Sequence, residues 1–334
     1  MKTPEKKQIK TIGILTSGGD APGMNAAVRA VTRSALFNDM NVKGIFKGYA
    51  GLMNNQMQDM TLRSVSDILQ RGGTMLYSAR CPEFKEDAGV ERAKHNCIAS
   101  GIDGLIVCGG DGSFRGARDL SLKGVPCIGI PGTIDNDISC SDYTIGFDTA
   151  VSTAVSNIDR LRDTSQSHDR CSVVEVMGRH CGDIALHSAI CCGAVSVLVP
   201  EIEFDLDRDV IAKMVKTLKS GKNHFIVIVA EGVTNAPGAM SAYEIARYIE
   251  KKTGIESRET VLGHIQRGGT PTHRDRVIAS HMGHYAVQLL KKGIGNRVVA
   301  MKDNKIVDYD ILEGLEMKKT INMDLLKVAN EISI

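Results

Sequence analysis

The sequence contains no tryptophan, and all aromatic side chains together make up only 4% of its 334 residues. Its 41 basic residues are nearly balanced by 39 acidic ones, so the formal net charge is +2. Proteins that bind nucleic acid usually combine a basic surface with aromatic side chains on which bases stack. The composition therefore gives no reason to expect a nucleic-acid partner, and any anion must be bound by a local group of residues.

The sequence also offers no segment suited to crossing a membrane. Residues 184–200 carry no charge, but His187, Ser188 and Gly193 divide them into a helix end and a strand. The N-terminal sequence MKTPEKKQIK is charged and no apolar core follows it, so we expect no secretory signal. The nine cysteines form no CxxC pair, and some of them, such as Cys108, lie in apolar runs. These features predict a reduced, cytoplasmic protein.

Length and hydrophobic pattern indicate two domains, because 334 residues exceed what one simple core accommodates. Apolar runs typical of buried strands alternate with segments of helical periodicity along the whole chain. This alternation predicts an α/β fold with a mostly parallel, doubly wound sheet in each domain. The predicted elements include strands at 105–108 and 125–130, helices from 65 and at 114–122, and a terminal hairpin around Asp303 and Asn304.

Charged residues recur directly after the predicted strands. They are Asp20, Asp111, Asp135, Arg179, Glu231 and His264. In open α/β sheets the ligand crevice lies outside the carboxyl ends of the strands. A single residue of this kind would mean little, whereas the recurrence predicts a catalytic cleft.

Two glycine-rich loops are suited to binding phosphate. The first follows a predicted strand at 11–15 and leads into a helix from about Asn25, whose positive end faces the same place. In the second, Asp111 lies among Gly110, Gly112 and Gly116. A carboxylate directed at phosphates needs a cation between them, and Mg²⁺ binds through one or two carboxylates plus phosphate oxygens. The sequence therefore predicts a magnesium–polyphosphate site at Asp111.

Asp135 follows the neighbouring predicted strand and is suited to a different role from that of Asp111. Within hydrogen-bond reach of a hydroxyl, it can take the proton as that hydroxyl attacks a phosphoryl group. Taken singly, Asp111 and Asp135 are explained equally well as Asx-turn residues or helix caps. The surplus of donors in the second half of the chain suits a phosphorylated second substrate. These donors are Arg170, Arg179, Arg258, His264 and Arg267.

Other functions fit the same glycines less well. The run Gly110, Gly112, Gly116 has one residue too many for a dinucleotide fingerprint, and Asp111 would oppose a pyrophosphate that lacks a metal. No GxxxxGKS or GxxxxGKT sequence is present, which excludes a P-loop kinase. A non-catalytic nucleotide sensor remains an alternative, in which Asp135 is only a turn residue.

Five sequence blocks, in order along nearly the whole chain, resemble those of bacterial ATP-dependent 6-phosphofructokinases. They are SGGDAPGMN at Ser17–Asn25, GGDGS at Gly109–Ser113, PGTIDND at Pro131–Asp137, VEVMGR at Val174–Arg179 and GHIQRGG at Gly263–Gly269. The resemblance implies transfer of the γ-phosphoryl group of ATP to the 1-hydroxyl of fructose 6-phosphate in glycolysis. It also implies an ATP-binding domain at 1–146 plus about 271–318, and a fructose 6-phosphate domain at about 147–265 plus 319–334.

The resemblance further implies roles for individual residues. Asp135 would be the base, with Asp137 beside it, while Thr133 and Arg179 would help to neutralise the transferring phosphoryl group. Asp111 would hold Mg²⁺. The ATP site would be lined by Gly19, Arg80, Cys81, Gly110, Asp111, Gly112, Ser113 and Gly116. The sugar phosphate would contact Thr133, Ile134, Asp135, Arg170, Met177, Gly178, Arg179, Glu231, Arg258, His264, Ile265, Gln266 and Arg267.

In the family, the residues matching Arg170 and Arg258 reach over from a neighbouring subunit, which implies a homo-oligomer, typically a tetramer. An effector site for ADP or phosphoenolpyruvate is implied by Arg29, Arg33, Arg162 and Lys222. Val195 and Leu62 depart from the family pattern, which has a glutamate and an arginine there, so we expect weaker or altered ADP activation.

Two glycines bear on the phosphoryl donor. Pyrophosphate-dependent relatives tend to carry aspartate and lysine at the positions of Gly112 and Gly132, whereas both are glycine here. The resemblance therefore favours ATP, with a pyrophosphate-dependent enzyme as the alternative.

Overall fold

The computed structural model describes residues 9–333, which fold into two compact units. Within the described residues, unit 1 takes in 9–134, Ile138–Asp148 and Arg267–Lys319. Unit 2 takes in Asp135–Asp137, Thr149–Gln266 and 320–333. The chain passes between the units more than once, and one crossing lies within the PGTIDND block.

Unit 1 is built on a seven-stranded sheet in which all strands but the two at its edges run parallel. In spatial order the strands are β11 (Lys305–Asp310), β10 (Arg297–Lys302), β5 (Cys127–Pro131), β4 (Gly104–Gly109), β1 (Thr11–Thr16), β2 (Asn41–Ile45) and β3 (Met57–Asp59). The edge strands β11 and β3 are antiparallel to their neighbours.

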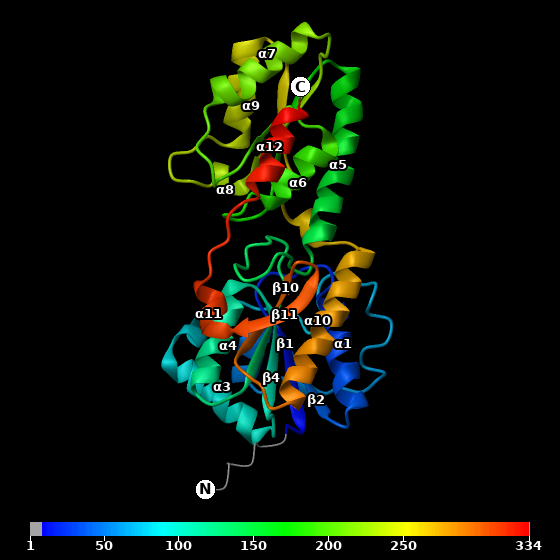
Figure 1. Cartoon of the computed structure of the whole chain (residues 1–334), viewed down its shortest axis with the longest axis vertical. Helices are drawn as coiled ribbons and strands as arrows, with labels where there is room; N and C mark the ends of the chain where they lie inside the picture. The colour runs from blue at the N-terminus through cyan, green and yellow to red at the C-terminus, as the bar shows by residue number, and fades with distance from the viewer. Residues whose placement is uncertain (1–8, 334) are drawn as a thin grey trace. The chain divides into compact units, whose positions relative to one another are not determined.

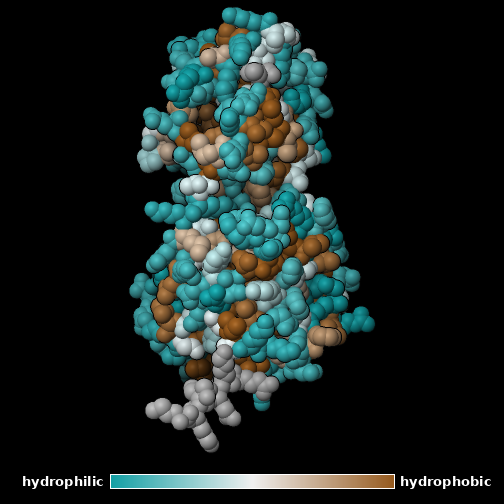
Figure 2. Space-filling view, in the orientation of Figure 1, coloured by the Kyte–Doolittle hydropathy of each residue, from teal (hydrophilic) through white to brown (hydrophobic). Residues whose placement is uncertain are grey.

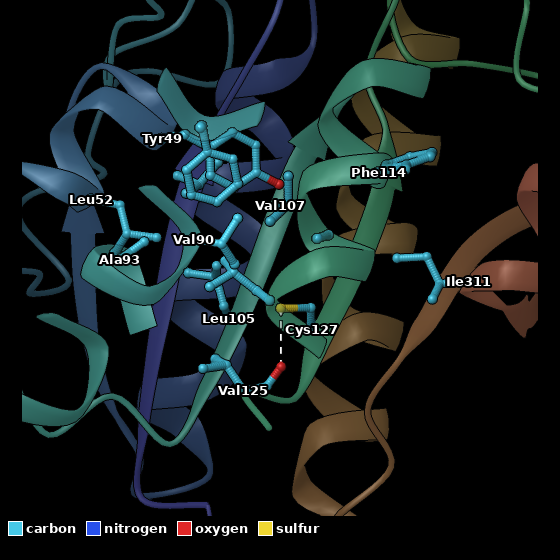
Figure 3. Close-up of a cluster of buried hydrophobic side chains, with 14 of the residues drawn as sticks. Tyr49, Leu52, Val90, Ala93, Leu105, Val107, Phe114, Val125, Cys127 and Ile311 are labelled. Carbon is cyan, nitrogen blue, oxygen red and sulfur yellow. Dashed lines mark hydrogen bonds between the residues drawn. The ribbon is translucent and has the colours of Figure 1, made fainter. Parts of the chain in front are cut away.

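Helices cover both faces of this sheet, as expected for a doubly wound fold (Figure 1). The helices of unit 1 are α1 (Met24–Phe37), α2 (Gly48–Met53), α3 (Asp87–Ala99), α4 (Asp111–Leu122), α10 (His273–Lys291) and α11 (Ile311–Glu316), with a 3-10 turn at Pro82–Lys85. Helix α1 packs against α10, whereas α3 packs against α2 and α4. Figure 3 shows the core under the second group, where Tyr49, Leu52 and Val90 meet Leu105 and Val107 of β4.

Unit 2 is built on a four-stranded parallel sheet. In spatial order its strands are β7 (Ser196–Leu198), β8 (Phe225–Ala230), β6 (Cys171–Val176) and β9 (Ser257–Val261). Its helices are α5 (Phe147–Ser167, which begins in unit 1), α6 (Asp183–Cys192), α7 (Ala212–Lys219), α8 (Glu231–Thr234), α9 (Ala242–Thr253) and α12 (Met323–Glu331). A π-helical turn at Asp207–Ile211 and a 3-10 turn at Gly263–Arg267 complete the elements.

The predicted α/β class and mostly parallel sheets are confirmed, and so is the terminal hairpin. β10 and β11 pair through Asp303 and Asn304, which both have positive φ angles of 49° and 60°. Such a two-residue turn matches the twist of the paired strands. Helix α9 begins with a capping box, which Ser241 and Glu244 form.

Several local predictions are wrong. Residues 65–69 form turns instead of a helix: Asp67 has a φ of 55°, and the Thr61 and Ser64 side chains bond each other's backbone amides. Helix α4 begins at Asp111 and not at Phe114, because an acidic residue in the first turn suits the helix dipole. Helix α5 begins at Phe147, and Asp148 in its first turn accepts a hydrogen bond from the Thr272 hydroxyl. The prediction also missed β2 and α2.

The surface is mixed in character, and Figure 2 shows hydrophobic side chains scattered among hydrophilic ones on the face in view. None of the helices within residues 9–333 is long and apolar enough to cross a membrane. All nine cysteines are free thiols, and burial raises the pKa of Cys108 to about 12. A buried thiol with such a pKa stays protonated at neutral pH and is chemically inert.

Candidate active site

The strand order of unit 1 reverses between β1 and β4, and this fixes where a ligand binds. From β1 the chain continues to β2 and β3 on one side, and from β4 to β5 and β10 on the other. The ends of these strands are level, since Thr16 pairs with Cys108 and Gly109 pairs with Pro131. At such a switch point the loops diverge and leave a crevice. The loops that diverge here are the two glycine-rich loops.

A third loop is held against the exit of β1. Ser78 Oγ donates to Gly18 O at 2.5 Å, and Thr16 Oγ1 donates to Tyr77 O at 2.9 Å. These bonds place the segment before Arg80 and Cys81 beside the first glycine-rich loop. The structure thus brings together, within unit 1, the three segments that carry the predicted ATP residues.

In the second loop, the lack of a side chain has different consequences at Gly112 and at Gly116. A Cβ atom on Gly112 would meet nothing within 4 Å, so the space beside it is open to a ligand. A Cβ atom on Gly116 would lie 2.8 Å from the Tyr49 ring and 2.9 Å from the Phe84 ring. Gly116 is therefore explained by packing within unit 1. Whether it also lines an ATP site stays a prediction.

Tyr49 is a residue that the sequence reasoning missed. Its ring stacks on Phe84 at a centroid distance of 4.0 Å, and its hydroxyl donates to Ser113 O at 2.5 Å. Burial raises the pKa of Tyr49 well above its ordinary value, so it remains a protonated donor. This bond braces the first turn of α4. No sequence signal links Tyr49 to Ser113, because the two lie far apart in the chain.

Asp111 is placed in the first turn of α4, where its carboxylate accepts a hydrogen bond from Arg115 Nε at 2.8 Å. Its side chain remains 41% exposed next to the open space at Gly112. Within residues 9–333 no group of three His, Cys, Asp or Glu side chains is arranged to hold a metal ion. One accessible carboxylate beside open space fits Mg²⁺ that is bound mainly by a nucleotide, since Mg²⁺ is usually held by one or two carboxylates plus phosphates.

The exit of β5 carries Gly132 and Thr133. Gly132 N donates to Gly109 O at 3.0 Å, which joins this exit to that of β4. Thr133 O accepts from Thr144 Oγ1 at 2.6 Å. A Cβ atom on Gly132 would lie 2.7 Å from Cys108 Sγ, so a larger side chain there would have to displace a buried thiol. The Arg267 guanidinium lies in the same unit, against Gly19, and donates to Asp20 O at 3.2 Å.

In unit 2 the candidate base and its arginine face each other. Asp135 is 3% exposed, and its Oδ2 lies 3.9 Å from Arg179 Nε. Arg179 Nη1 lies 4.0 Å from Asp137 Oδ2, and the arginine side chain is 63% exposed. Between the two aspartates, Asn136 adopts a φ of 53° and donates to Asp183 Oδ2 at 2.7 Å. Asp183, which the sequence reasoning missed, therefore fixes the turn that presents both carboxylates.

The exit of β6 is held by Glu231, the first residue of α8, which directly follows the neighbouring strand β8. Its Oε1 atom accepts from Gly178 N at 3.0 Å and from Arg179 N at 2.7 Å. Gly178 has a φ of 140°, and a Cβ atom on it would lie 2.3 Å from Cys181 O. Only glycine fits this turn, which aims Arg179 away from the sheet. Met177 is buried at the same exit.

The remaining predicted sugar-phosphate residues lie along β6 and β9. Arg170 and Arg258 both form ion pairs with Glu256, each with an N–O distance of 2.8 Å, and the two guanidinium groups lower the pKa of the glutamate. The sequence reasoning missed Glu256. After β9, His264 and Ile265 are exposed, whereas Gln266 is fully buried with its amide on Gly263 O.

The four predicted effector residues fall into two pairs, one in each unit. Arg29 and Arg33 lie on α1, where burial and the neighbouring Arg33 lower the pKa of Arg29. Arg162 and Lys222 lie in unit 2, where burial and Arg162 lower the pKa of Lys222. Val195 is fully buried in the core of unit 2. It therefore presents no group to a ligand.

Comparison with known proteins gives one consistent result. Residues 11–290 match the family model "Phosphofructokinase". The chain is 52% identical to "ATP-dependent 6-phosphofructokinase" of Bacillus cytotoxicus over 326 residues, which cover 98% of this chain and all of the relative. It is also 52% identical to the protein of the same name from Bacillus cereus over 330 residues, again 98% of this chain and all of the relative.

Solved structures agree with this result. Phosphofructokinase from Saccharomyces cerevisiae superposes with a TM-score of 0.87 and 32% identity over 97% of this chain, which spans 48% of that longer chain. A pyrophosphate-dependent phosphofructokinase from Marinobacter aquaeolei superposes with a TM-score of 0.81 at 21% identity, covering 95% of this chain and 86% of that chain. The second likeness shows the fold alone.

Proposed function

The chain belongs to the phosphofructokinase family, and from that premise we propose how its residues carry out the reaction. The reaction is the transfer of the γ-phosphoryl group of ATP to the 1-hydroxyl of fructose 6-phosphate, which gives fructose 1,6-bisphosphate and ADP in glycolysis. Relatives of 52% identity over nearly the full chain carry the name ATP-dependent 6-phosphofructokinase. The chain is accordingly an ATP-dependent 6-phosphofructokinase by homology.

Unit 1 binds ATP in this proposal, and unit 2 holds the sugar phosphate. The support is the topological switch point between β1 and β4, where the glycine-rich loops and the segment before Arg80 and Cys81 meet. Backbone amides of glycine loops and helix starts are natural phosphate ligands. Asp111 holds Mg²⁺, which, when bound, neutralises charge on the β- and γ-phosphates. The open space at Gly112 leaves room for the polyphosphate.

Asp135 is the general base in this proposal. The observation that carries it is a nearly buried carboxylate with an arginine guanidinium 3.9 Å away, both at strand exits. Asp135 takes the proton from the attacking hydroxyl, which makes the oxygen a better nucleophile. Arg179, whose side chain is largely exposed, offsets negative charge on the phosphoryl group in flight, together with Thr133. Asp137 holds Arg179 from the other side.

The sugar phosphate is bound by polar side chains that follow β6, β8 and β9. Glu231 accepts hydroxyl hydrogen bonds, and His264 and Arg267 donate to the phosphate. Arg170 and Arg258 serve the site of a neighbouring subunit, so the enzyme is a homo-oligomer, a tetramer in this proposal, and cytoplasmic. The support for this role is that both arginines pair with one exposed glutamate, Glu256. Arg258 remains 65% exposed, so its guanidinium is accessible to a second anion.

An effector anion, a nucleotide or phosphoenolpyruvate, binds at Arg29, Arg33, Arg162 and Lys222. The support is that burial and a neighbouring arginine lower the pKa of both Arg29 and Lys222, so that positive charge is concentrated at each pair. Because Val195 is buried in the core, we expect ADP to activate weakly. Rates measured against fructose 6-phosphate with and without ADP test this, and a full-strength response contradicts it.

The reaction itself is tested by a coupled assay of fructose 1,6-bisphosphate formation with Mg²⁺, comparing ATP with pyrophosphate. We expect turnover with ATP alone, since Gly112 leaves open space and a side chain at Gly132 would displace Cys108. Turnover with pyrophosphate would overturn the donor while leaving the role of Asp135 in place. Absence of turnover with both donors would favour the alternative, a nucleotide sensor in which Asp135 is a turn residue.

A further inference from the structure

Asp275 is a fully buried carboxylate that the mechanism above does not use. It lies in the first turn of α10, where the Thr272 hydroxyl caps the helix and accepts from Asp275 N. Its Oδ1 atom accepts two hydrogen bonds, from Tyr143 Oη at 2.6 Å and from Gly146 N at 2.7 Å. A buried carboxylate is costly unless it is hydrogen-bonded, and a helix N-terminus favours its charge. The side chain therefore binds the segment 143–146 firmly to α10.

The same segment is bonded to the exit of β5. Ile145 N donates to Pro131 O at 2.9 Å, and residues Gly132 and Ile145 form an isolated parallel bridge. Thr144, which is fully buried, donates from Oγ1 to Thr133 O at 2.6 Å. The carbonyl groups of Pro131 and Thr133, on either side of Gly132, are thus both bonded to the segment that Asp275 holds.

Close packing ties the segment to the exit of β1 as well. Gly146 has a φ of 103°, and a Cβ atom on it would lie 2.6 Å from Ala21 Cβ. Gly23 has a φ of 106°, and a Cβ atom on it would lie 2.7 Å from Ile145 Cγ2. Two glycines in left-handed conformations therefore let the loop after β1 touch the segment directly. All of these contacts lie within unit 1.

We propose that Asp275 is a positioning residue for phosphoryl transfer, acting through Tyr143 and Gly146. The Asp275 clamp, defined as Asp275, Tyr143, Thr144, Ile145 and Gly146, fixes the main chain of Gly132 and Thr133 relative to the glycine-rich loop after β1. Asp275 does not touch the reacting atoms. It sets the place from which Thr133 and the following Asp135 act, so the inference rests on the proposed roles of those two residues.

The chemistry of Tyr143 suits this task. Burial and the Asp275 carboxylate raise the pKa of Tyr143 well above its ordinary value, so the phenol remains a donor at any working pH. The Arg274 guanidinium lies over the Tyr143 ring, 4.7 Å from its centroid, and restrains the ring from the other side. Phosphoryl transfer depends mainly on positioning, and a misplacement of about 1 Å costs roughly 10²-fold in rate.

The test is Tyr143→Phe, which removes one hydrogen bond and leaves the ring in place. The matched control is Tyr285→Phe on α10, the helix that carries Asp275, and it removes a tyrosine–aspartate bond of the same 2.6 Å length, to Asp308 Oδ1. We expect Tyr143→Phe to lower kcat by about 10- to 100-fold with KM for ATP and fructose 6-phosphate changed less than about twofold. Tyr285→Phe should lower the melting temperature by a similar amount and leave kcat unchanged.

The proposal is overturned if kcat of Tyr143→Phe stays near wild type, if Tyr285→Phe loses as much, or if only KM changes. Asp275→Asn should also lower kcat, because a neutral amide oxygen accepts both hydrogen bonds more weakly than a carboxylate does; if it does not fold, the comparison of the two tyrosine variants still decides. Asp135→Ala, measured alongside, reports separately on the proposed base. Retained turnover in Asp135→Ala refutes that base, whereas a loss there combined with an unaffected Tyr143→Phe refutes the Asp275 clamp alone.

Discussion

The exits of β5 in unit 1 and β6 in unit 2 are each held by one carboxylate from a distant part of the chain. Asp275 holds the first through Tyr143 and Gly146, and it is fully buried. Glu231 holds the second through the amides of Gly178 and Arg179, and it is only half-buried. A buried carboxylate can serve as framework alone, whereas a half-buried one remains within reach of a substrate. At the β5 exit the carboxylate of Asp275 only holds the main chain in place. At the β6 exit the carboxylate of Glu231 both holds the main chain and is available to bind the substrate.

The largest effect should come from the residue that follows the β5 exit. Asp135→Ala removes the proposed base, and we expect turnover to fall by about 10²- to 10⁴-fold, about 3–5 kcal/mol, with little change in sugar binding. Steady-state kinetics of fructose 1,6-bisphosphate formation measure this. Asp163→Ala, an exposed aspartate on α5, is the control. A drop of less than about tenfold would show that the chemistry does not depend on the β5 exit in this way.

The next largest effect tests whether Glu231 binds the substrate as well as holding the β6 exit. Glu231→Ala leaves the amides of Gly178 and Arg179 without their acceptor and removes a ligand of the sugar. Loss of hydrogen bonds to a charged group costs about 1.5–3 kcal/mol, so kcat/KM for fructose 6-phosphate should fall roughly 10- to 100-fold, with KM for ATP unchanged. If KM for both substrates were unaffected and only stability fell, Glu231 would, like Asp275, hold the main chain without binding the substrate.

Substitutions of Gly178 and Gly112 test the comparison through the free energy of unfolding. Gly178→Ala places a Cβ atom 2.3 Å from Cys181 O at a φ of 140°, so we expect a loss of about 1–3 kcal/mol in the free energy of unfolding. Gly112→Ala is its counterpart, because its Cβ atom meets nothing within 4 Å. This variant should unfold like wild type while KM for ATP rises. Urea unfolding measures the stability of both variants, and steady-state kinetics measure their KM for ATP. Equal stability of the two variants would contradict the claim that only glycine fits the turn at Gly178.

The smallest effect should come from a salt bridge far from both exits. Lys123 bonds Asp87 at 2.6 Å and Glu91 at 2.9 Å on the surface of unit 1, and it lowers the pKa of Glu91 below its ordinary 4.5. A lowered carboxylate pKa stabilises the fold above that ordinary value, and the contribution disappears as pH falls through the folded-state value. Lys123→Met should thus lower the melting temperature by at most a few degrees at pH 7 and not at about pH 3. An undiminished difference at the lower pH, or one insensitive to salt, would exclude an ionic origin.

Much of this architecture follows from local sequence pattern. The alternation of apolar strands and amphipathic helices predicts parallel sheets, and the charged residues after the strands predict which edge holds the site. The Asp303–Asn304 turn and the Ser241 capping box are likewise local, because each depends on residues within one turn of chain. Where the local signal is weak, prediction fails: Val65–Leu69 has a helical pattern, but Asp67 and the Thr61–Ser64 pair favour turns.

The supports of the site could not be predicted in this way. Tyr143 and Asp275 are 132 positions apart, and Tyr49 and Ser113 are 64 apart. Asn136 and Asp183 are 47 positions apart, and the ion pair between Arg170 and Glu256 depends on β6 lying beside β9. Strand order is set by packing of the whole sheet, and no local pattern records it.

By itself, the sequence determined the α/β class, the residues that follow each strand and, through five blocks, the resemblance to a kinase family. The tertiary structure alone decided which carboxylate holds each strand exit and which glycine is required by packing. The physical reason is that periodicity acts over a few residues, whereas a buried hydrogen bond forms only after folding has excluded water and fixed both partners.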